Sequence, residues 1–354
     1  MENKEFRDTV TSKALALIRW PLVMCIVAVH VFVPVSITVD GVVYDMGSSS
    51  MNAGLWRFVQ GFVSENGVAT FFFISGFLFM TGQAMTPARY KSKVRRRVHS
   101  LLIPYVIWNA LTLLCAVVLA SDGISTLSML KGFVMKNALG YPHDAPLWFI
   151  RDLMVCIAVV PVFGLIIRKS GWWAVAMLGV VCFWLYTRPS SYPLLLVSAM
   201  FFFYWGAFMA ISGRGDLYAE FRPLMVPCLI LYPLLGMAHV LVEPLSHEWG
   251  MLTKCCNLLV VIPLAVNVAC WFVNRGYSAN RFLTSATFFV FASHYVVIAY
   301  CRPLLVGAIQ PKSEAGLLLT FVAGYFMLLG SLLGVYFLLT RFTPRVARIL
   351  TGKR

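Results

Sequence analysis

The sequence predicts an all-α protein that crosses a lipid bilayer about ten times, with both termini in the cytoplasm. Of its 354 residues, 60% are hydrophobic and only 12% are charged, and the mean hydropathy is +0.81. Soluble domains carry about 25% charged residues, so water cannot be the main solvent of this chain. A bilayer core about 30 Å thick takes roughly 20 apolar residues for each helical crossing. Ten such helices leave room only for loops and short tails, and we therefore expect one membrane domain over residues 1–354.

Apolar runs bounded by charged residues, proline or glycine give the order of the expected spans. These runs lie at 15–35, 67–84, 99–119, 147–167, 171–187, 193–212, 224–243, 253–273, 284–304 and 317–340. The two longest connections, 36–66 and 120–146, are polar and contain glycine. Loops of this composition suit contact with an external ligand.

The positive charges predict the orientation. Most of the 29 Lys and Arg residues fall on the side that also holds the N-terminus, six of them within residues 89–97. Cytoplasmic loops carry an excess of Lys and Arg, so this distribution places both termini in the cytoplasm. The net charge of +15 is explained by this topology. Since the basic residues flank apolar segments and form no separate domain, we expect no nucleic-acid partner.

The first predicted span contains two ionisable residues, Arg19 and His30. Such side chains are costly within a bilayer unless they face a partner or a wet cavity. Their spacing brings them within about 20° of the same helix face and ~16 Å apart along the axis. Arg19 then suits an anion arriving from the cytoplasm, and His30 suits a general base or a transient acyl acceptor. Spacing alone leaves the alternative that Arg19 marks the interface and His30 bonds to a neighbouring helix.

The basic segment 89–97 directly precedes the apolar residues Leu101–Tyr105. Clustered Arg and Lys beside a membrane suit phosphate groups, which they bind through bidentate and point-charge contacts. The ligand is either a nucleotide-like cofactor or an anionic lipid. On charge alone, lipid binding and topology are the commoner explanations.

Other polar residues give weaker indications. Arg151 and Asp152 lie at the outer end of the fourth span, and as helix neighbours they point about 100° apart, so we expect them to pair with other helices. Either an interface anchor or a substrate contact explains them. His239 and Glu243 share one helix face, which supplies only two metal ligands, so we expect no metal. The nine cysteines contain no CxxC pair.

Five segments, distributed in order over most of the chain, give the strongest indication of function. They are Arg19-x10-His30, Phe71–Leu78, Arg96–Tyr105, Leu147–Leu153 and Phe288–Tyr295. Together they resemble the membrane-bound acyltransferase family 3, which includes O-acetyltransferases of bacterial surface polysaccharides and the enterobacterial-common-antigen acetyltransferase. The resemblance implies that an acyl-CoA, usually acetyl-CoA, binds from the cytoplasm. Its acyl group would reach a sugar hydroxyl within or across the membrane.

The resemblance also assigns residues to roles. Arg19 and His30 correspond to the essential pair of the family, with His30 as general base or acyl relay. Arg19 and the cluster Arg95, Arg96 and Arg97 would orient the anionic CoA. The substrate-binding candidates are Trp148, Arg151, Asp152 and His294.

We therefore expect a multi-pass acyltransferase of a bacterial inner membrane. It would move an acetyl or similar acyl group from cytoplasmic acyl-CoA to a hydroxyl of a cell-surface glycan or lipid-linked saccharide, in contact with membrane lipids. The competing class is a secondary transporter or flippase for a glycan or a small anionic solute. Ten spans with a charged inner mouth suit that class equally, although the repeats typical of such folds are not evident.

Overall fold

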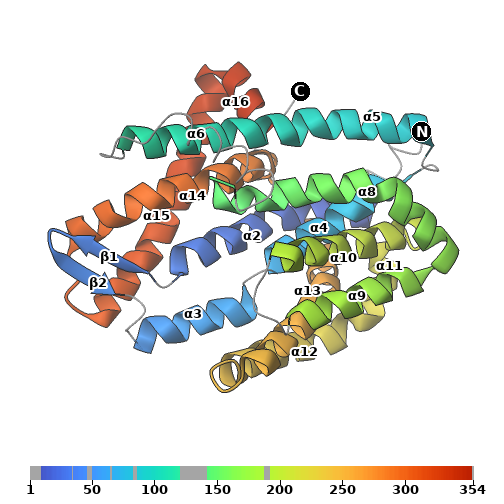
Figure 1. Ribbon diagram of the computed structural model, residues 1–354, viewed down its shortest axis with the longest axis horizontal. Coiled ribbons are helices and arrows are strands. Elements are labelled where there is room, and N and C mark those ends of the chain that lie inside the picture. Colours follow the sequence, from blue (N-terminus) through green and yellow to red (C-terminus); the bar gives the residue numbers. More distant parts are fainter. Residues whose placement is uncertain are drawn as a thin grey trace. The chain divides into compact units, whose positions relative to one another are not determined.

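The computed structural model describes residues 9–33, 35–45, 50–63, 66–82, 86–119, 142–186 and 192–352. Over these residues the fold is nearly all-α, which confirms the predicted fold class (Figure 1). Eight described helices are long and apolar enough to cross a membrane, and two shorter apolar helices lie at 172–185 and 196–211. Together they account for the ten predicted spans. The cytoplasmic location of both termini stays a prediction.

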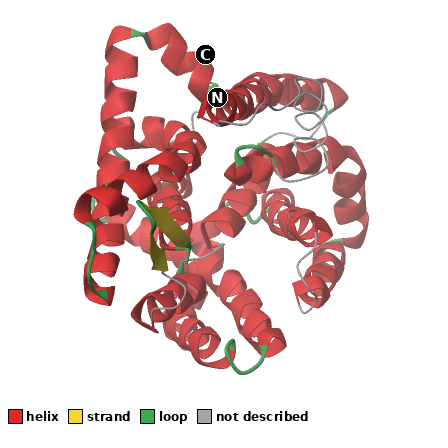
Figure 2. Cartoon of the chain, turned by 60° about the vertical axis from the view of Figure 1, so that its left-hand side comes forward, coloured by secondary structure: helices red, strands yellow, loops and turns green. Residues whose placement is uncertain are grey.

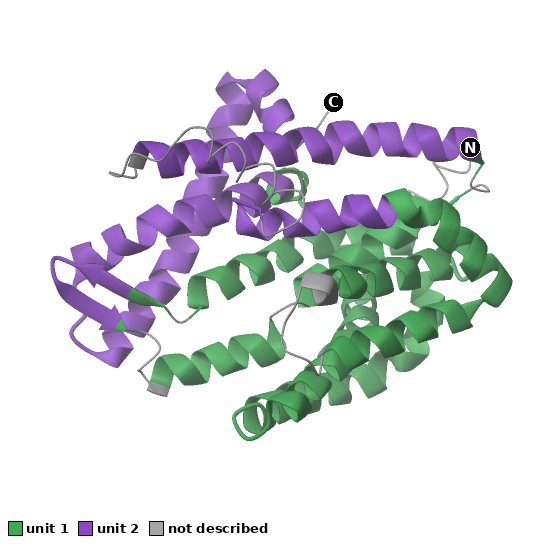
Figure 3. Ribbon diagram, viewed as in Figure 1, with its two compact units in different colours: residues 1–36, 45–86, 158–287 green, residues 37–44, 87–157, 288–354 purple. Residues whose placement is uncertain are grey.

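The chain divides into two compact units (Figure 3). Unit 1 comprises residues 1–36, 45–86 and 158–287, and unit 2 comprises 37–44, 87–157 and 288–354. The chain passes from one unit to the other within α8 (Trp148–Ser170) and within α14 (Arg281–Ile309). The expectation of a single domain over the whole chain is not tested by this division.

Unit 1 contains the first, second and fifth to eighth predicted spans. Apart from its parts of α8 and α14, the helices of unit 1 are α2 (Val10–Phe32), α3 (Ser50–Phe62), α4 (Asn66–Met80), α9 (Trp172–Tyr186), α10 (Tyr192–Ile211), α11 (Leu217–Phe221), the 3₁₀ turn η3 (Arg222–Leu224), α12 (Met225–Val242) and α13 (His247–Asn274).

The closest helix contact in unit 1 joins α4 and α10. A Cβ atom added at Gly76 would overlap the carbonyl oxygen of Phe203, and one at Gly206 would overlap that of Phe73. Small residues at such positions let two helix backbones approach closely, as membrane helices often do. Phe73 and Phe203 themselves are fully buried and belong to the core of unit 1.

Unit 1 also exposes apolar side chains in a manner typical of lipid contact. Helix α12 exposes Val226, Ile230, Leu234, Met237 and Leu241, which recur every three or four residues along one face. An apolar stripe of this length would be unfavourable in water but is favourable against lipid tails. The exposed stripe therefore agrees with the membrane assignment.

Unit 2 contains a long helical run and the C-terminal helices. Besides its parts of α8 and α14, its helical elements are α5 (Pro87–Arg97), the π-helical turn η1 (Val98–Leu102), α6 (Ile103–Leu119), the 3₁₀ turn η2 (Ala145–Leu147), α15 (Glu314–Phe342) and α16 (Pro344–Thr351). Helices α5 and α6 follow each other through η1 without a break in the helical ribbon (Figure 1).

The predicted outer connection 36–66 contains more structure than a loop. Strands β1 (Ser36–Val39) and β2 (Val42–Asp45) form a two-stranded hairpin, and α3 follows it (Figure 2). Asp40 and Gly41 have φ angles of 50° and 78°. Positive φ at both central residues favours an Asp-Gly turn that matches the twist of a hairpin. The second predicted connection, 120–146, lies outside the described residues as far as residue 141.

Candidate functional site

The predicted pair Arg19 and His30 lies on α2 in unit 1, and both side chains are half-buried. Thr9 caps this helix, since its Oγ1 accepts a hydrogen bond from the backbone N–H of Ser12 at 3.1 Å. Pro21 lies between the two residues and has no N–H to donate to the carbonyl of Leu17, so one backbone hydrogen bond of the helix is missing. The structure thus places both residues on one helix, as expected. Their catalytic roles stay predictions.

Hydrophobic contacts set the orientation of α2 within unit 1. The helix buries Leu15, Ile18, Leu22 and Ile26. Gly67 of α4 approaches it so closely that an added Cβ would lie 2.8 Å from the carbonyl oxygen of Leu22. Because one face is fixed against its neighbours, the half-buried Arg19 and His30 have a defined orientation.

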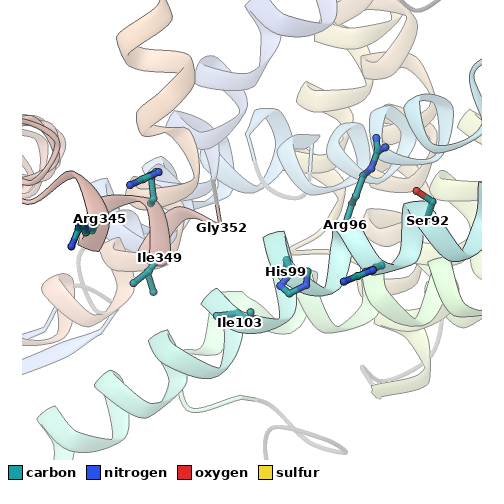
Figure 4. Close-up of a pocket in the computed structure, with 9 residues that line it drawn as sticks. Ser92, Arg96, His99, Ile103, Arg345, Ile349 and Gly352 are labelled. Atoms are coloured by element: carbon teal, nitrogen blue, oxygen red, sulfur yellow. The ribbon is translucent and has the colours of Figure 1, made fainter. Parts of the chain in front are cut away.

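Unit 2 contains a basic pocket (Figure 4). Its volume is about 900 Å³, within the range of cofactor sites. Two walls line it. The first consists of Ser92, Arg95, Arg96, His99 and Ile103, and the second of Arg345, Arg348, Ile349 and Gly352.

The first wall comes from the α5–η1–α6 run. Helix α5 has no buried residue, and the side chains of Arg95, Arg96 and His99 are exposed. The structure therefore brings two of the three predicted phosphate-binding arginines to the pocket. Arg97 is half-buried and is not among the pocket-lining residues of the described chain. Its position follows from the helix, in which the next residue points about 100° away.

The π-helical turn η1 separates the polar α5 from the apolar α6. The N–H of Ile103 donates to the carbonyl of Val98, five residues earlier, as a π-helix requires. Such turns insert an additional residue and are frequent at functional sites. Here the turn contains His99 and precedes Ile103, both of which line the pocket.

The sequence does not predict the second wall, because Arg345 and Arg348 also fit the excess of Lys and Arg expected on the cytoplasmic side. They lie on α16, a short helix with Pro344 at its first turn and Gly352 as its C-cap. Proline at the first turn and glycine just after the last are typical helix boundaries. That pattern, following directly on the last span, is the signal that could have revealed a separate helix here.

The fourth-span candidates differ from expectation. Arg151 and Asp152 were expected to pair with other helices, but Arg151 Nε lies 2.9 Å from Asp152 Oδ1, and both are buried. The prediction was wrong about this contact because the long Arg side chain bends back to its neighbour's carboxylate. Trp148 is the first residue of α8.

A buried acid adjoins these residues in the sequence. Asp144 is fully buried, and its backbone N–H donates to Asn109 Oδ1 of α6 at 3.0 Å. Burial raises the pKa of the Asp144 carboxyl to about 8. The backbone hydrogen bond to Asn109 ties the segment before α8 to α6, and it does not involve the Asp144 carboxyl.

His294 is fully buried in α14, where its Nδ1 lies 2.6 Å from the carbonyl oxygen of Phe291. Phe291 in turn packs edge-on against Phe149 of α8, with ring centroids 5.8 Å apart. This hydrogen bond within its own helix fits a packing role. A role for His294 in substrate binding stays a prediction.

Potential metal ligands are dispersed over the described chain. No group of three or more His, Cys, Asp or Glu residues that could hold a metal ion occurs among the described residues. His239, which shares a predicted helix face with Glu243, has its Nδ1 2.8 Å from the carbonyl oxygen of Gly250.

Comparison with known proteins gives two matches. The sequence profile of a family described as "Acyltransferase domain" matches residues 12–340. The succinoglycan biosynthesis protein ExoH of Rhizobium meliloti (strain 1021) is 22% identical over 329 residues, which cover 86% of this chain and 84% of that protein. No solved structure matches the chain significantly.

Proposed function

Since the chain belongs to this acyltransferase family, whose profile covers residues 12–340, we propose that it is a membrane-bound, acyl-CoA-dependent O-acyltransferase. The donor would be acetyl-CoA or a similar acyl-CoA from the cytoplasm. The acceptor would be a hydroxyl of a cell-surface glycan or a lipid-linked saccharide. The similarity to a protein of succinoglycan biosynthesis supports a polysaccharide acceptor. The protein would reside in a bacterial inner membrane.

The basic pocket of unit 2 is the observation that carries the choice of donor. Four Arg side chains line it, and its described lining contains no Asp or Glu. Coenzyme A carries a 3′-phosphate and a diphosphate, with about four negative charges in total near neutral pH. Arginine binds such groups through planar bidentate contacts. The charge and the volume of the pocket thus suit the nucleotide portion of CoA.

The chemistry of the transfer is proposed for His30 of α2. Its neutral imidazole would remove the proton of the acceptor hydroxyl while that oxygen attacks the thioester carbonyl carbon. A C–O bond then forms, the C–S bond breaks, and CoA leaves as a thiolate that takes up a proton. In the relay alternative, the imidazole accepts the acyl group first and passes it on. Arg19 would orient the anionic donor.

The acceptor side is proposed for residues of α8 and α14. Trp148 offers an aromatic surface, and Arg151, Asp152 and His294 offer polar groups. The buried ion pair holds the Arg151 and Asp152 side chains together, so it is suited to positioning a sugar.

Acyl transfer to glycan in isolated membranes tests the proposal. Membranes containing the wild type would receive acetyl-CoA labelled in the acetyl group, and label would be followed into the glycan fraction. We expect incorporation by the wild type and loss of incorporation by His30→Ala. His247→Ala is the matched control, because His247 is an exposed histidine at the start of α13 in the same unit.

The outcomes separate the two functional classes. Label incorporation that is unchanged in His30→Ala would exclude the assigned role of this residue. Movement of an unmodified solute without any acyl transfer would favour the transporter or flippase.

A further inference from the structure

We propose that the C-terminal helix α16 is a donor-binding element in which Arg345 and Arg348 bind phosphate groups of the acyl donor. The inference rests on the proposed function, since it takes the donor to be acyl-CoA. It adds two binding residues that lie far in the sequence from the basic segment 89–97. Helix geometry, the packing of α16 and the charge of the pocket support it.

Helix geometry places the α16 residues on one face. The pocket contacts Arg345, Arg348, Ile349 and Gly352, which follow the spacing i, i+3, i+4 and i+7. Residues at this spacing share one face of an α-helix. The helix therefore presents a continuous face with two guanidinium groups to the pocket.

The first wall repeats the same pattern. Its polar members Ser92, Arg95, Arg96 and His99 also follow the spacing i, i+3, i+4 and i+7. Two helix faces of the same design thus line one cavity, and each contributes a pair of arginines (Figure 4). Two arginine pairs match a ligand with two separated phosphate groups better than a ligand with a single phosphate group.

Two sets of contacts hold α16 in place, one on the face opposite the pocket and one at its C-cap. Ala347 and Thr351 are buried, and Trp108 Nε1 of α6 donates to the carbonyl oxygen of Leu350 at 3.0 Å. Gly352 has a φ of 63°, and a Cβ added there would overlap the carbonyl of Ser100 in η1. These contacts leave the side chains of Arg345 and Arg348 exposed.

Within the described part of the chain, no ion pair neutralises the arginines of the pocket. Ion pairs within the described residues join Arg151 to Asp152 and Arg214 to Glu220, and neither includes a pocket arginine. Guanidinium groups gathered in one cavity repel one another unless an anion is bound. The ligand class is accordingly a polyphosphate, which the CoA nucleotide supplies. A lipid headgroup offers the same chemistry with a single phosphate.

Steady-state kinetics of the detergent-solubilised full chain test this proposal. Arg345→Ala/Arg348→Ala should raise the KM for acetyl-CoA at least about tenfold, because each lost charge-assisted contact weakens ground-state binding. The kcat should stay near the wild-type value, because the acyl-transfer step does not use these residues. The affinity for CoA, measured by isothermal titration calorimetry, should fall in parallel.

Two further variants control for charge and folding. Arg341→Ala removes a neighbouring exposed cation that does not line the pocket, and it should behave like the wild type. Arg345→Lys/Arg348→Lys keeps the charge but not the fork geometry, and it should recover part of the lost affinity. Thermal melting of each variant reports folding, and the single Ala variants carry the test should the double variant not fold.

The results distinguish this inference from the proposed function. An active wild type whose KM is unchanged in Arg345→Ala/Arg348→Ala overturns the role of α16 and leaves the proposed function intact. An inactive wild type that binds no CoA overturns the proposed function as well. A lipid role predicts an unchanged affinity for CoA together with an activity that depends on Arg345 and Arg348 only in phosphatidylglycerol nanodiscs and not in phosphatidylcholine nanodiscs. That result would also overturn the inference.

Discussion

Helix α2 in unit 1 and the basic pocket in unit 2 differ in how they hold their polar groups. On α2, one arginine and one histidine are half-buried in a helix that is mostly apolar. In the pocket, exposed arginines from two helices surround a cavity of about 900 Å³. Partial burial on α2 reduces the contact of the two side chains with solvent and restricts their movement. The pocket instead concentrates positive charge at an exposed surface.

This difference implies a division of labour. A general base benefits from a restricted environment, because its orientation and protonation decide the rate. A phosphate site benefits from many donors and long-range attraction, because it must capture a charged ligand from solution. Changes on α2 should therefore lower kcat, and changes in the pocket should raise the KM for the donor.

The largest expected effect comes from α2. His30→Ala should lower kcat by about a hundredfold or more, because it removes the proposed general base or acyl acceptor. Affinity for CoA should change little. Single-turnover acetyl transfer, combined with calorimetric CoA titration, measures both quantities. A large loss of CoA affinity with an unchanged kcat would reverse the proposed division between the two regions.

The second effect concerns the first wall of the pocket. Arg95→Ala/Arg96→Ala should raise the KM for acetyl-CoA at least about tenfold and leave kcat nearly unchanged. High salt should reduce the difference from the wild type, since ions screen exposed charges. KM measured over a series of NaCl concentrations checks this. A fall in kcat at saturating donor would show that these arginines act in the chemical step.

The two regions also differ in how well the sequence predicts them. Arg19 and His30 lie on one helix, so the helical period by itself relates their positions. The pocket depends on contacts of α16 with α6 and η1, and the sequence predicts only its first wall. Arg345 and Arg348 were missed because a basic C-terminus also fits the positive-inside rule.

The sequence likewise predicts some features of the fold and not others. The order and approximate positions of the apolar helices followed from hydropathy, because the bilayer fixes their length and composition. The π-helical turn at Val98–Leu102 has no distinct sequence pattern. The contact of Arg151 with Asp152 depends on side-chain conformation rather than on spacing. Such features arise from tertiary packing, which a single sequence does not reveal.

A smaller effect is expected where the pocket is held together. Trp108→Phe removes the hydrogen bond to the carbonyl of Leu350 but keeps an aromatic ring against Phe289, whose ring centroid lies 5.7 Å from that of Trp108. Loosening α16 should raise the KM for acetyl-CoA by about two- to fivefold, as expected for the loss of one neutral hydrogen bond. The kcat should not change.

Steady-state kinetics at saturating acceptor measure this effect. Trp205→Phe, the same substitution in α10 of unit 1, serves as the comparison and should leave the KM for the donor unaltered. An equal rise in both variants would indicate a general loss of stability and not a specific loss of α16 docking.

The smallest effect on donor binding is expected for Asp144, whose substitution should change the stability of the protein but not the KM for acetyl-CoA. Asp144 is fully buried, and burial raises its pKa to about 8, compared with 3.8 for a free aspartate. Between these values the folded protein holds a proton that the unfolded chain releases, so the free energy of unfolding falls as pH rises from about 4 to about 8. Asp144→Asn cannot titrate and should not show this fall.

The melting temperature of Asp144→Asn relative to the wild type should therefore increase from pH 5 to pH 8, by more than about 2 °C. Differential scanning fluorimetry of both proteins in detergent measures it, and the KM for acetyl-CoA should be equal in the two. A constant difference over this pH range would mean that the Asp144 carboxyl is already ionised in the folded protein. A changed KM would instead show that the segment before α8 influences the basic pocket. Asp144 would then contribute to donor binding as well as to stability.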